Sequence, residues 1–301
     1  MRFVTYEFAG REVVGVLNGG SDKIIPLAAY GREFAADGCL PDTMIGLIQA
    51  GDEAMARVHK LLEWSGKDEV AVALDSVRLL APIPRPLKNI LCVGKNYADH
   101  AKELALADSA SVVPENPVFF TKAPTTVNAP GADVKSHSAI TQGLDYEVEL
   151  ALIIGKKGIN IPKEEAFDYI FGYTIMNDVT GRDLQNRHLQ WFRGKSLDTC
   201  APLGPWIVHR SALPNADKLD VCCKINGEVR QKSNTSKFIF DIPTLIATLS
   251  SGMTLEAGDI IATGTPAGVG AGFKPPRFLK AGDVMELEIE GIGILKNRIV
   301  D

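Results

Sequence analysis

The chain has 301 residues, of which 46% are hydrophobic and 23% charged, as is typical of a globular protein with a sizeable core. Its net charge of −5 lacks the basic excess of a nucleic-acid-binding surface, so we expect no nucleic-acid partner. No apolar stretch approaches the roughly 20 residues of a membrane-spanning helix, and Glu7 and Arg11 interrupt what would be the core of an export signal. The five cysteines include no Cys-x-x-Cys pair, which indicates reduced thiols. We therefore expect a cytoplasmic protein that is not bound to a membrane.

The first 80 residues predict a small α+β unit. Short alternating runs over residues 1–30 are typical of small strands in a meander. From Thr43 to Trp64 the apolar residues recur at helical spacing, so one or two helices are expected, with Gly66 as a helix stop. Residues 70–80 return to the pattern of a strand.

Three closely spaced prolines, Pro82, Pro84 and Pro86, cannot lie inside a helix or a central strand. We place a domain boundary here, which predicts a small N-terminal accessory domain over residues 1–80 and a larger domain over residues 81–301. The larger domain shows no regular βαβ series, so we predict a mostly β, α+β fold of mixed sheets, not a Rossmann or TIM fold. The expected strands are 89–93, 118–120, 147–154, 172–177, 204–208, 221–225, 260–263 and 284–289, and the expected helices are 96–104, 163–169, 182–188 and 242–250.

Two glutamates lie close together in the segment LDYEVELALII. In a strand, Glu147 and Glu149 project to one face, while Val148 and Leu150 point the other way. Burying both carboxylates without compensation would be costly, and a divalent cation would offset that cost. Asp178, at the end of YTIMND, would complete an all-oxygen set suited to Mg²⁺, Mn²⁺ or Ca²⁺ and not to structural zinc. The alternative is the solvent face of an edge strand, against which the apolar run ALII argues.

Further polar residues could carry chemistry, although each also has a simpler interpretation. His100 and Glu103 would touch on a helix, and a histidine oriented by a carboxylate is suited to act as a general base. Arg182 and Lys195 would suit a carboxylate-bearing substrate near a metal. The Gly-rich run ATGTPAGVGAG around Thr265 can offer N–H groups to an anion. Taken singly, these segments are better explained as a surface helix, exposed cations and a tight turn.

Seven blocks follow one another between about residues 82 and 300: VGKNYADHAKE, NPVFFTKAPT, LDYEVELALIIGK, GYTIMNDVTGRDLQ, FRGKSLDTCAPLGP, INGEVRQ and TLEAGDIIATGTPAGVG. In this order they resemble the fumarylacetoacetate hydrolase family. The resemblance implies a β-roll catalytic domain of mixed sheets that forms a homodimer and holds one Mg²⁺ or Mn²⁺ per chain. It also implies that the first 80 residues are the small accessory domain of many bacterial members.

The same resemblance implies roles for individual residues. The family's His-x-x-Glu dyad lies on a short helix that often closes over the site as a lid. The implied residues are Glu147, Glu149 and Asp178 for the metal, His100, Glu103 and Lys195 for catalysis, and Arg182, Gln185 and Thr265 for substrate binding.

The activity implied by the resemblance is the metal-dependent cleavage of a C–C bond in a short 2-oxo acid through an enolate. Acylpyruvate hydrolases and oxaloacetate decarboxylases of the family work in this way, and in a hydrolase His100 would activate water. The alternative is an enzyme of aromatic degradation of the 2-hydroxyhepta-2,4-diene-1,7-dioate isomerase or 5-oxopent-3-ene-1,2,5-tricarboxylate decarboxylase type. The single Glu-x-Glu block disfavours this alternative. A non-enzymatic metal-dependent scaffold is a third possibility, against which the matched polar residues argue.

Overall fold

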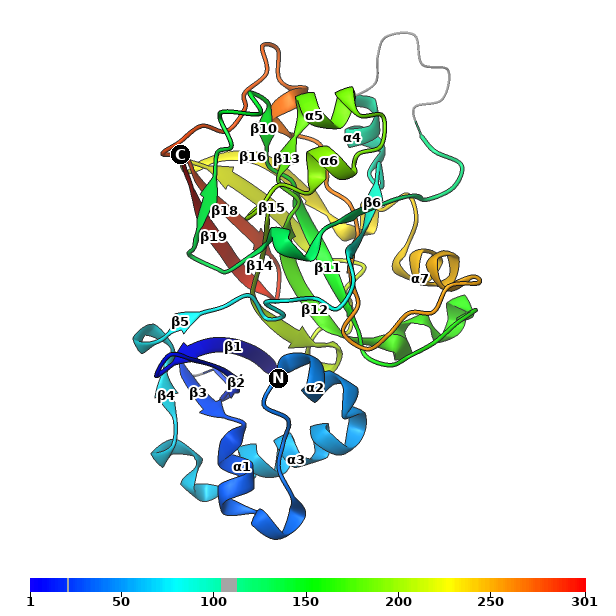
Figure 1. The fold of residues 1–301 in the computed structure, drawn as a ribbon. Coiled ribbons are helices and arrows are strands. Elements are labelled where there is room, and N and C mark those ends of the chain that lie inside the picture. The colour runs from blue at the N-terminus through cyan, green and yellow to red at the C-terminus, as the bar shows by residue number, and fades with distance from the viewer. Residues whose placement is uncertain (21, 104–112) are drawn as a thin grey trace.

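The protein is seen here in a computed structural model that describes residues 1–20, 22–103 and 113–301 (Figure 1). Among these residues a large mixed sheet and a smaller five-stranded sheet dominate, with few and mostly short helices. The predicted strand-rich, mixed-sheet α+β class is therefore confirmed. No helix among the described residues has both the length and the apolar character needed to cross a membrane.

The large sheet has twelve strands and joins the N-terminal segment to the rest of the chain. Most neighbours are antiparallel, but β17 and β6 run parallel, as do β14 and β8. In spatial order the strands are β4 (Val72–Ala73), β3 (Lys23–Pro26), β2 (Arg11–Leu17), β1 (Arg2–Phe8), β14 (Ala201–His209), β12 (Ile170–Asn177), β11 (Val148–Ile154), β17 (Ile260–Ala262), β6 (Ile90–Gly94) and β7 (Val118–Lys122), with β5 (Arg78–Leu79) beside β1 and β8 (Val127–Asn128) beside β14.

A five-stranded sheet packs against one face of β11 and β12. Side chains of β11 such as Val148 and Leu150 share a buried apolar core with Val221 and Leu287 of that sheet. Helix α7 (Ile242–Ser250) adds to the same core, and the side chain of Asp241 caps its first turn by accepting a hydrogen bond from the Thr244 N–H. The sheet order is β16 (Glu228–Asn234), β15 (Asp220–Ile225), β18 (Val284–Ile289), β19 (Gly293–Val300) and β9 (Asp133–Lys135), and a separate pair consists of β10 (Leu144–Asp145) and β13 (Thr180–Gly181).

The N-terminal segment forms the lower part of the molecule in Figure 1, where its strands extend the large sheet and its helices pack on one side. A second apolar core contains residues of this segment together with Ile153 of β11 and Phe171 of β12. The segment is thus attached through a shared sheet and a shared core, and the domain boundary at residue 81 stays a prediction. Its helices are α1 (Ala28–Glu33), α2 (Met44–Gln49) and α3 (Gly51–Glu63).

Several predicted elements were wrong in type or extent. The strand pattern before Tyr30 ends at Pro26, because Ala29 and Tyr30 turn into the N-terminal core as part of α1. Residues 70–80 contain only two-residue strands around a short 3-10 helix. Residues 163–169 form a 3-10 helix that buries only Ala166, so they lack the apolar stripe that stabilises an α-helix. Strands β16 and β19 were not predicted, although β19 alternates between buried and exposed residues.

Candidate active site and metal centre

The neighbouring strands β11 and β12 bring the three predicted metal ligands together. Strand β11 begins at Val148, one residue later than predicted, because the Glu147 N–H donates to the side chain of Asn177 in β12 (3.0 Å) and not to a backbone carbonyl of that strand. The Asp178 N–H donates to the Glu147 carbonyl (2.9 Å), which holds the two residues side by side. Glu147 and Glu149 are 4% and 2% exposed, so they do not lie on a solvent face.

Glu147, Glu149 and Asp178 each direct a carboxylate oxygen into one cluster. These oxygens lie within 4.8 Å of one another, and all three side chains are buried. A compact set of carboxylate oxygens fits a hard divalent cation such as Mg²⁺ or Mn²⁺. Among the described residues this is the one such group of acidic, histidine or cysteine side chains. The residues present therefore fit the metal implied by the sequence.

Three buried cations surround the carboxylate cluster. Lys195 Nζ lies 2.8 Å from Glu147 Oε2 and 2.7 Å from Asp178 Oδ2. On the other side, Lys122 Nζ lies 2.7 Å from Asp178 Oδ1 and donates to the Val179 carbonyl at 3.0 Å. The third cation, Arg182, contacts Glu147 Oε1 at 2.6 Å. Glu147 and Asp178 thus have partners of opposite charge, whereas Glu149 has no ion pair among the described residues.

The two glutamates differ in pKa for this reason. Burial alone would raise the pKa of Glu147, but Lys195 and Arg182 outweigh it and lower that pKa to about 2. Burial raises the pKa of Glu149 well above its ordinary value, and the nearby charges of Asp178 and Glu147 raise it further. The site therefore lacks positive charge at Glu149, which a divalent cation next to this carboxylate would supply.

The Gly-rich segment after β17 gives its backbone N–H groups to carboxylates of the protein itself. Gly264 N–H donates to Glu149 Oε2 at 2.9 Å, and Gly270 and Ala271 N–H donate to the two oxygens of Asp145 at 2.6 and 3.0 Å. The Thr265 hydroxyl donates to the Val148 carbonyl at 3.0 Å. The predicted anion-binding loop thus holds acidic residues of the site in place, and the proposed contact of Thr265 with substrate stays a prediction.

The His-x-x-Glu pair lies on helix α4 (Ala98–Glu103), and Leu104, the last residue of the predicted helix, lies outside the described residues. His100 Nδ1 lies 3.3 Å from Glu103 Oε2, so the predicted contact is formed. Glu103 also accepts a hydrogen bond from the Gly268 N–H at 2.9 Å. A Cβ atom on Gly272 would lie 2.1 Å from Glu103 Oε1, so any larger residue at this position would displace the Glu103 carboxylate. Glu103 therefore joins α4 to the Gly-rich segment as well as orienting His100.

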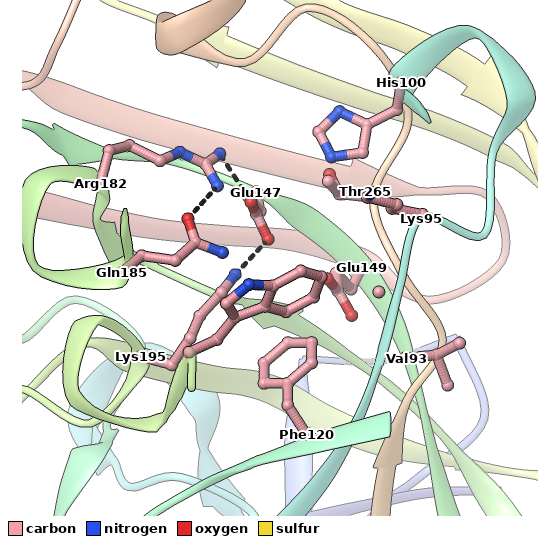
Figure 2. A pocket seen from close by; sticks show the side chains of 12 residues that line it. Val93, Lys95, His100, Phe120, Glu147, Glu149, Arg182, Gln185, Lys195 and Thr265 are labelled. Carbon is pink, nitrogen blue, oxygen red and sulfur yellow. Dashed lines mark hydrogen bonds and ion pairs between the residues drawn. The ribbon is translucent and has the colours of Figure 1, made fainter. Parts of the chain in front are cut away.

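A cavity of about 60 Å³ adjoins the carboxylate cluster and is lined by seven of the nine predicted site residues (Figure 2). The other two adjoin it, because Asp178 belongs to the carboxylate cluster and Glu103 contacts His100. Figure 2 shows Arg182, Gln185 and Lys195 approaching from one side and Lys95 and His100 from the other. The lining residues are Val93, Gly94, Lys95, His100, Phe120, Glu147, Glu149, Arg182, Gln185, Trp191, Lys195 and Thr265.

Several residues of the site were not among the predicted ones. Phe120 and Trp191 form an edge-to-face pair with ring centroids 5.3 Å apart, and Lys195 Nζ lies 4.9 Å from the Phe120 ring centroid. Asp145 accepts a hydrogen bond from Arg182 Nε at 2.8 Å, and Lys122 pairs with Asp178 as described. Lys122 had one visible signal, a lysine at the end of the strand VFFTK, whose first three residues are apolar.

Comparison with known proteins finds a matching family profile over most of the chain and similar proteins over its whole length. The profile of the family described as "Fumarylacetoacetate (FAA) hydrolase C-terminal" matches residues 89–300. The chain is 50% identical over 304 residues to the oxaloacetate tautomerase YisK of Bacillus subtilis (strain 168), a match that spans 99% of this chain and 100% of that protein.

Solved structures with the same fold cover the whole chain. A fumarylacetoacetate hydrolase from the psychrophile Exiguobacterium antarcticum is 42% identical, with a TM-score of 0.82 over 100% of this chain and 99% of the other. A maleylpyruvate hydrolase from Sphingobium sp. SYK-6, in complex with manganese(II) and pyruvate, is 31% identical, with a TM-score of 0.76 over 100% of this chain and 99% of the other.

Proposed function

The chain is an enzyme of the fumarylacetoacetate hydrolase family, and from this premise we propose that it converts oxaloacetate and related short 2-oxo acids through their enolates, with Mg²⁺ or Mn²⁺ as cofactor. The observation that carries the proposal is the convergence of Glu147, Glu149 and Asp178 with Arg182 and Lys195 at one small cavity. The relative at 50% identity is an oxaloacetate tautomerase, which makes interconversion of enol and keto oxaloacetate the first reaction to test.

Different residues of the site would bind the metal and stabilise the negative charge of the enolate. Glu147, Glu149 and Asp178 would hold the metal, which when bound would lower the energy of the negative charge that develops on the substrate. Arg182 and Lys195 add fixed positive charge in a site with little room for water. Tautomerisation of the enol requires one proton to leave oxygen and one to reach C3.

His100, which lines the cavity, is the residue proposed to carry a proton in this reaction. The contact between its Nδ1 and Glu103 Oε2 (3.3 Å) would orient the ring. The other ring nitrogen, Nε2, is then left to exchange a proton with substrate.

A second candidate function is cleavage of a C–C bond, by acylpyruvate hydrolysis or oxaloacetate decarboxylation. The pairing of His100 with Glu103 supports hydrolysis, because a histidine backed by a carboxylate can take a proton from water. Both candidates pass through an enolate and use the same carboxylates and cations. Isomerisation or decarboxylation of the aromatic-degradation type is the remaining alternative.

A substrate panel with each metal tests the proposal. The chain is incubated with Mg²⁺, with Mn²⁺, or after chelation, and offered oxaloacetate, acetylpyruvate, fumarylpyruvate and fumarylacetoacetate. We expect metal-dependent loss of enol oxaloacetate absorbance, with pyruvate formation reporting cleavage. Full activity after chelation would exclude the metal proposal, and inactivity on all four compounds would exclude the proposed substrate class.

We also propose that the protein forms a homodimer in the cytoplasm. The homodimer is what the resemblance to the family implies. Light scattering on the purified protein is expected to give twice the 32.4 kDa mass of the chain, and a monomer would contradict this proposal.

A further inference from the structure

Lys95 differs from the other cations that line the cavity. Arg182 is paired with Asp145 and Glu147, and Lys195 is paired with Glu147 and Asp178. Lys95 has no hydrogen bond or ion pair with any residue that the structure describes, and it is exposed. It comes from the turn between β6 and α4, on the side of the cavity opposite Arg182 and Lys195 (Figure 2). Its ammonium group is therefore available to bind an anion in the cavity.

The backbone at Lys95 is not suited to lysine. Its φ of 55° is left-handed, a region where glycine and asparagine are favoured. The backbone on both sides of Lys95 is held in place. Gly94 packs against Trp191, since a Cβ there would lie 2.3 Å from Trp191 Cζ3. The buried Asn96 donates to the Phe240 and Thr263 carbonyls at 3.1 and 2.8 Å. Strained positions of this kind cluster at functional sites, and here the turn carries the Lys95 side chain to the cavity rim.

The buried charged residues around the carboxylate cluster form the floor of the cavity. With a metal and a doubly charged substrate bound, the sum of charges there is negative by one unit, which one further cation would balance. With all four carboxyl groups ionised, as metal binding requires, four buried carboxylates lie beside three buried cations, which leaves one net negative charge before the metal is counted. A divalent metal changes this to one net positive charge, and the carboxylate next to the 2-oxo group of a substrate cancels it. A second carboxylate on the substrate would then lack a partner unless Lys95 supplied one. The floor residues counted are Asp145, Glu147, Glu149, Asp178, Lys122, Arg182 and Lys195.

We propose that Lys95 is a specificity-determining residue that binds the distal carboxylate of a dicarboxylic 2-oxo acid. This inference rests on the proposed function, and it adds which end of the substrate the β6–α4 turn recognises. A substrate with a neutral distal end gains nothing from Lys95, so the residue separates dicarboxylic from monocarboxylic 2-oxo acids.

The test compares two substrates that undergo the same reaction, oxaloacetate and its 4-methyl ester, which lacks the distal charge. Lys95→Asn removes the ammonium group and keeps a residue that tolerates the left-handed backbone, while Lys95→Arg keeps the charge. With Mg²⁺, we expect Lys95→Asn to lower kcat/KM for oxaloacetate by about 10-fold or more, mainly through KM. The ester is expected to change by less than about 3-fold, and Lys95→Arg to stay within about 3-fold of the wild type on oxaloacetate. Equal losses on both substrates, or no loss on oxaloacetate, would overturn the proposal.

A binding experiment separates this inference from the proposed function. Calorimetry with the Mg²⁺-loaded protein compares malate, which has a distal carboxylate, with lactate, which does not. Weaker binding of malate but not of lactate to Lys95→Asn supports the role of Lys95 even if the wild type turns over no oxaloacetate, in which case the proposed reaction alone is wrong. Unchanged malate binding would overturn the role of Lys95 even in an active enzyme.

Discussion

The floor and the rim of the cavity are held in place in different ways. At the floor, Glu147, Asp178 and Lys195 are buried and joined by ion pairs of 2.7 to 2.8 Å. At the rim, which comprises residues 95–103, His100 touches Glu103 at 3.3 Å and Lys95 has no partner among the described residues. Breaking a buried ion pair costs several kcal/mol, whereas the exposed Lys95 has no ion pair to lose among the described residues. The floor is therefore suited to fix the chemistry, and the rim is suited to differ between substrates.

The largest expected effect comes from the floor carboxylate that has no ion pair. We expect Glu149→Gln to abolish Mn²⁺ binding in calorimetry and to lower kcat/KM by about 1000-fold or more, or about 4 kcal/mol in the barrier. The exposed Glu164→Gln is the control and should behave as wild type. Retained Mn²⁺ binding by the Glu149 variant would mean that the floor is not the metal site.

Removing Lys122, the buried floor cation that does not line the cavity, should mainly affect stability. Lys122→Met leaves Asp178 Oδ1 without its charged partner, so we expect the free energy of unfolding in urea to fall by about 3 kcal/mol. Lys157→Met, at an exposed lysine, should change it by less than about 0.5 kcal/mol. A similarly small change at Lys122 would contradict the view that the floor is held by buried ion pairs.

At the rim, His100→Ala should separate the candidate reactions. We expect acetylpyruvate hydrolysis to fall by about 100-fold, because no general base remains to activate water. Oxaloacetate decarboxylation needs no attacking water and should fall by less than about 10-fold. Equal losses in both reactions would show that His100 serves a step they share, and His188→Ala, at an exposed histidine, is the control.

The smallest effect is expected where the rim meets the Gly-rich segment. Gly272→Ala would place a Cβ 2.1 Å from Glu103 Oε1, so the flexible carboxylate must move away from Gly268 and His100. We expect kcat/KM to fall by about 5-fold, with thermal unfolding nearly unchanged. Gly20→Ala, where nothing lies within 4 Å of the new Cβ, should have no effect. A clear loss of stability in Gly272→Ala would show that the contact of Glu103 with the Gly-rich segment stabilises the fold, as the floor ion pairs do, and does not only position the rim.

The sequence predicted the floor better than its surroundings. Alternation along one strand predicted that Glu147 and Glu149 share a face, and the family resemblance then favoured a metal site with Asp178 over a solvent-exposed face. Lys122 and Asp145 were missed because their partners, Asp178 and Arg182, come from distant parts of the chain and meet them only in the folded sheet.

The Gly-rich segment shows the same limit. Its glycines predicted a turn with free N–H groups, but no local pattern could tell that these groups bind Asp145, Glu149 and Glu103. The strand class of the fold was predictable from periodicity. Helix α1 was not, because burial of Tyr30 in the N-terminal core decides its conformation.

The pairing of β1 with β14 has a consequence for engineering this enzyme. Arg2 and Phe3 align with Val208 and Ile207, and both Phe3 and Ile207 are fully buried in one core. Deleting the first 80 residues would leave this part of β14 as an unpaired, apolar sheet edge, which is a template for aggregation. Residues 81–301 are therefore a poor candidate for expression without the N-terminal segment. Fused or immobilised forms of the enzyme should retain the N-terminal segment.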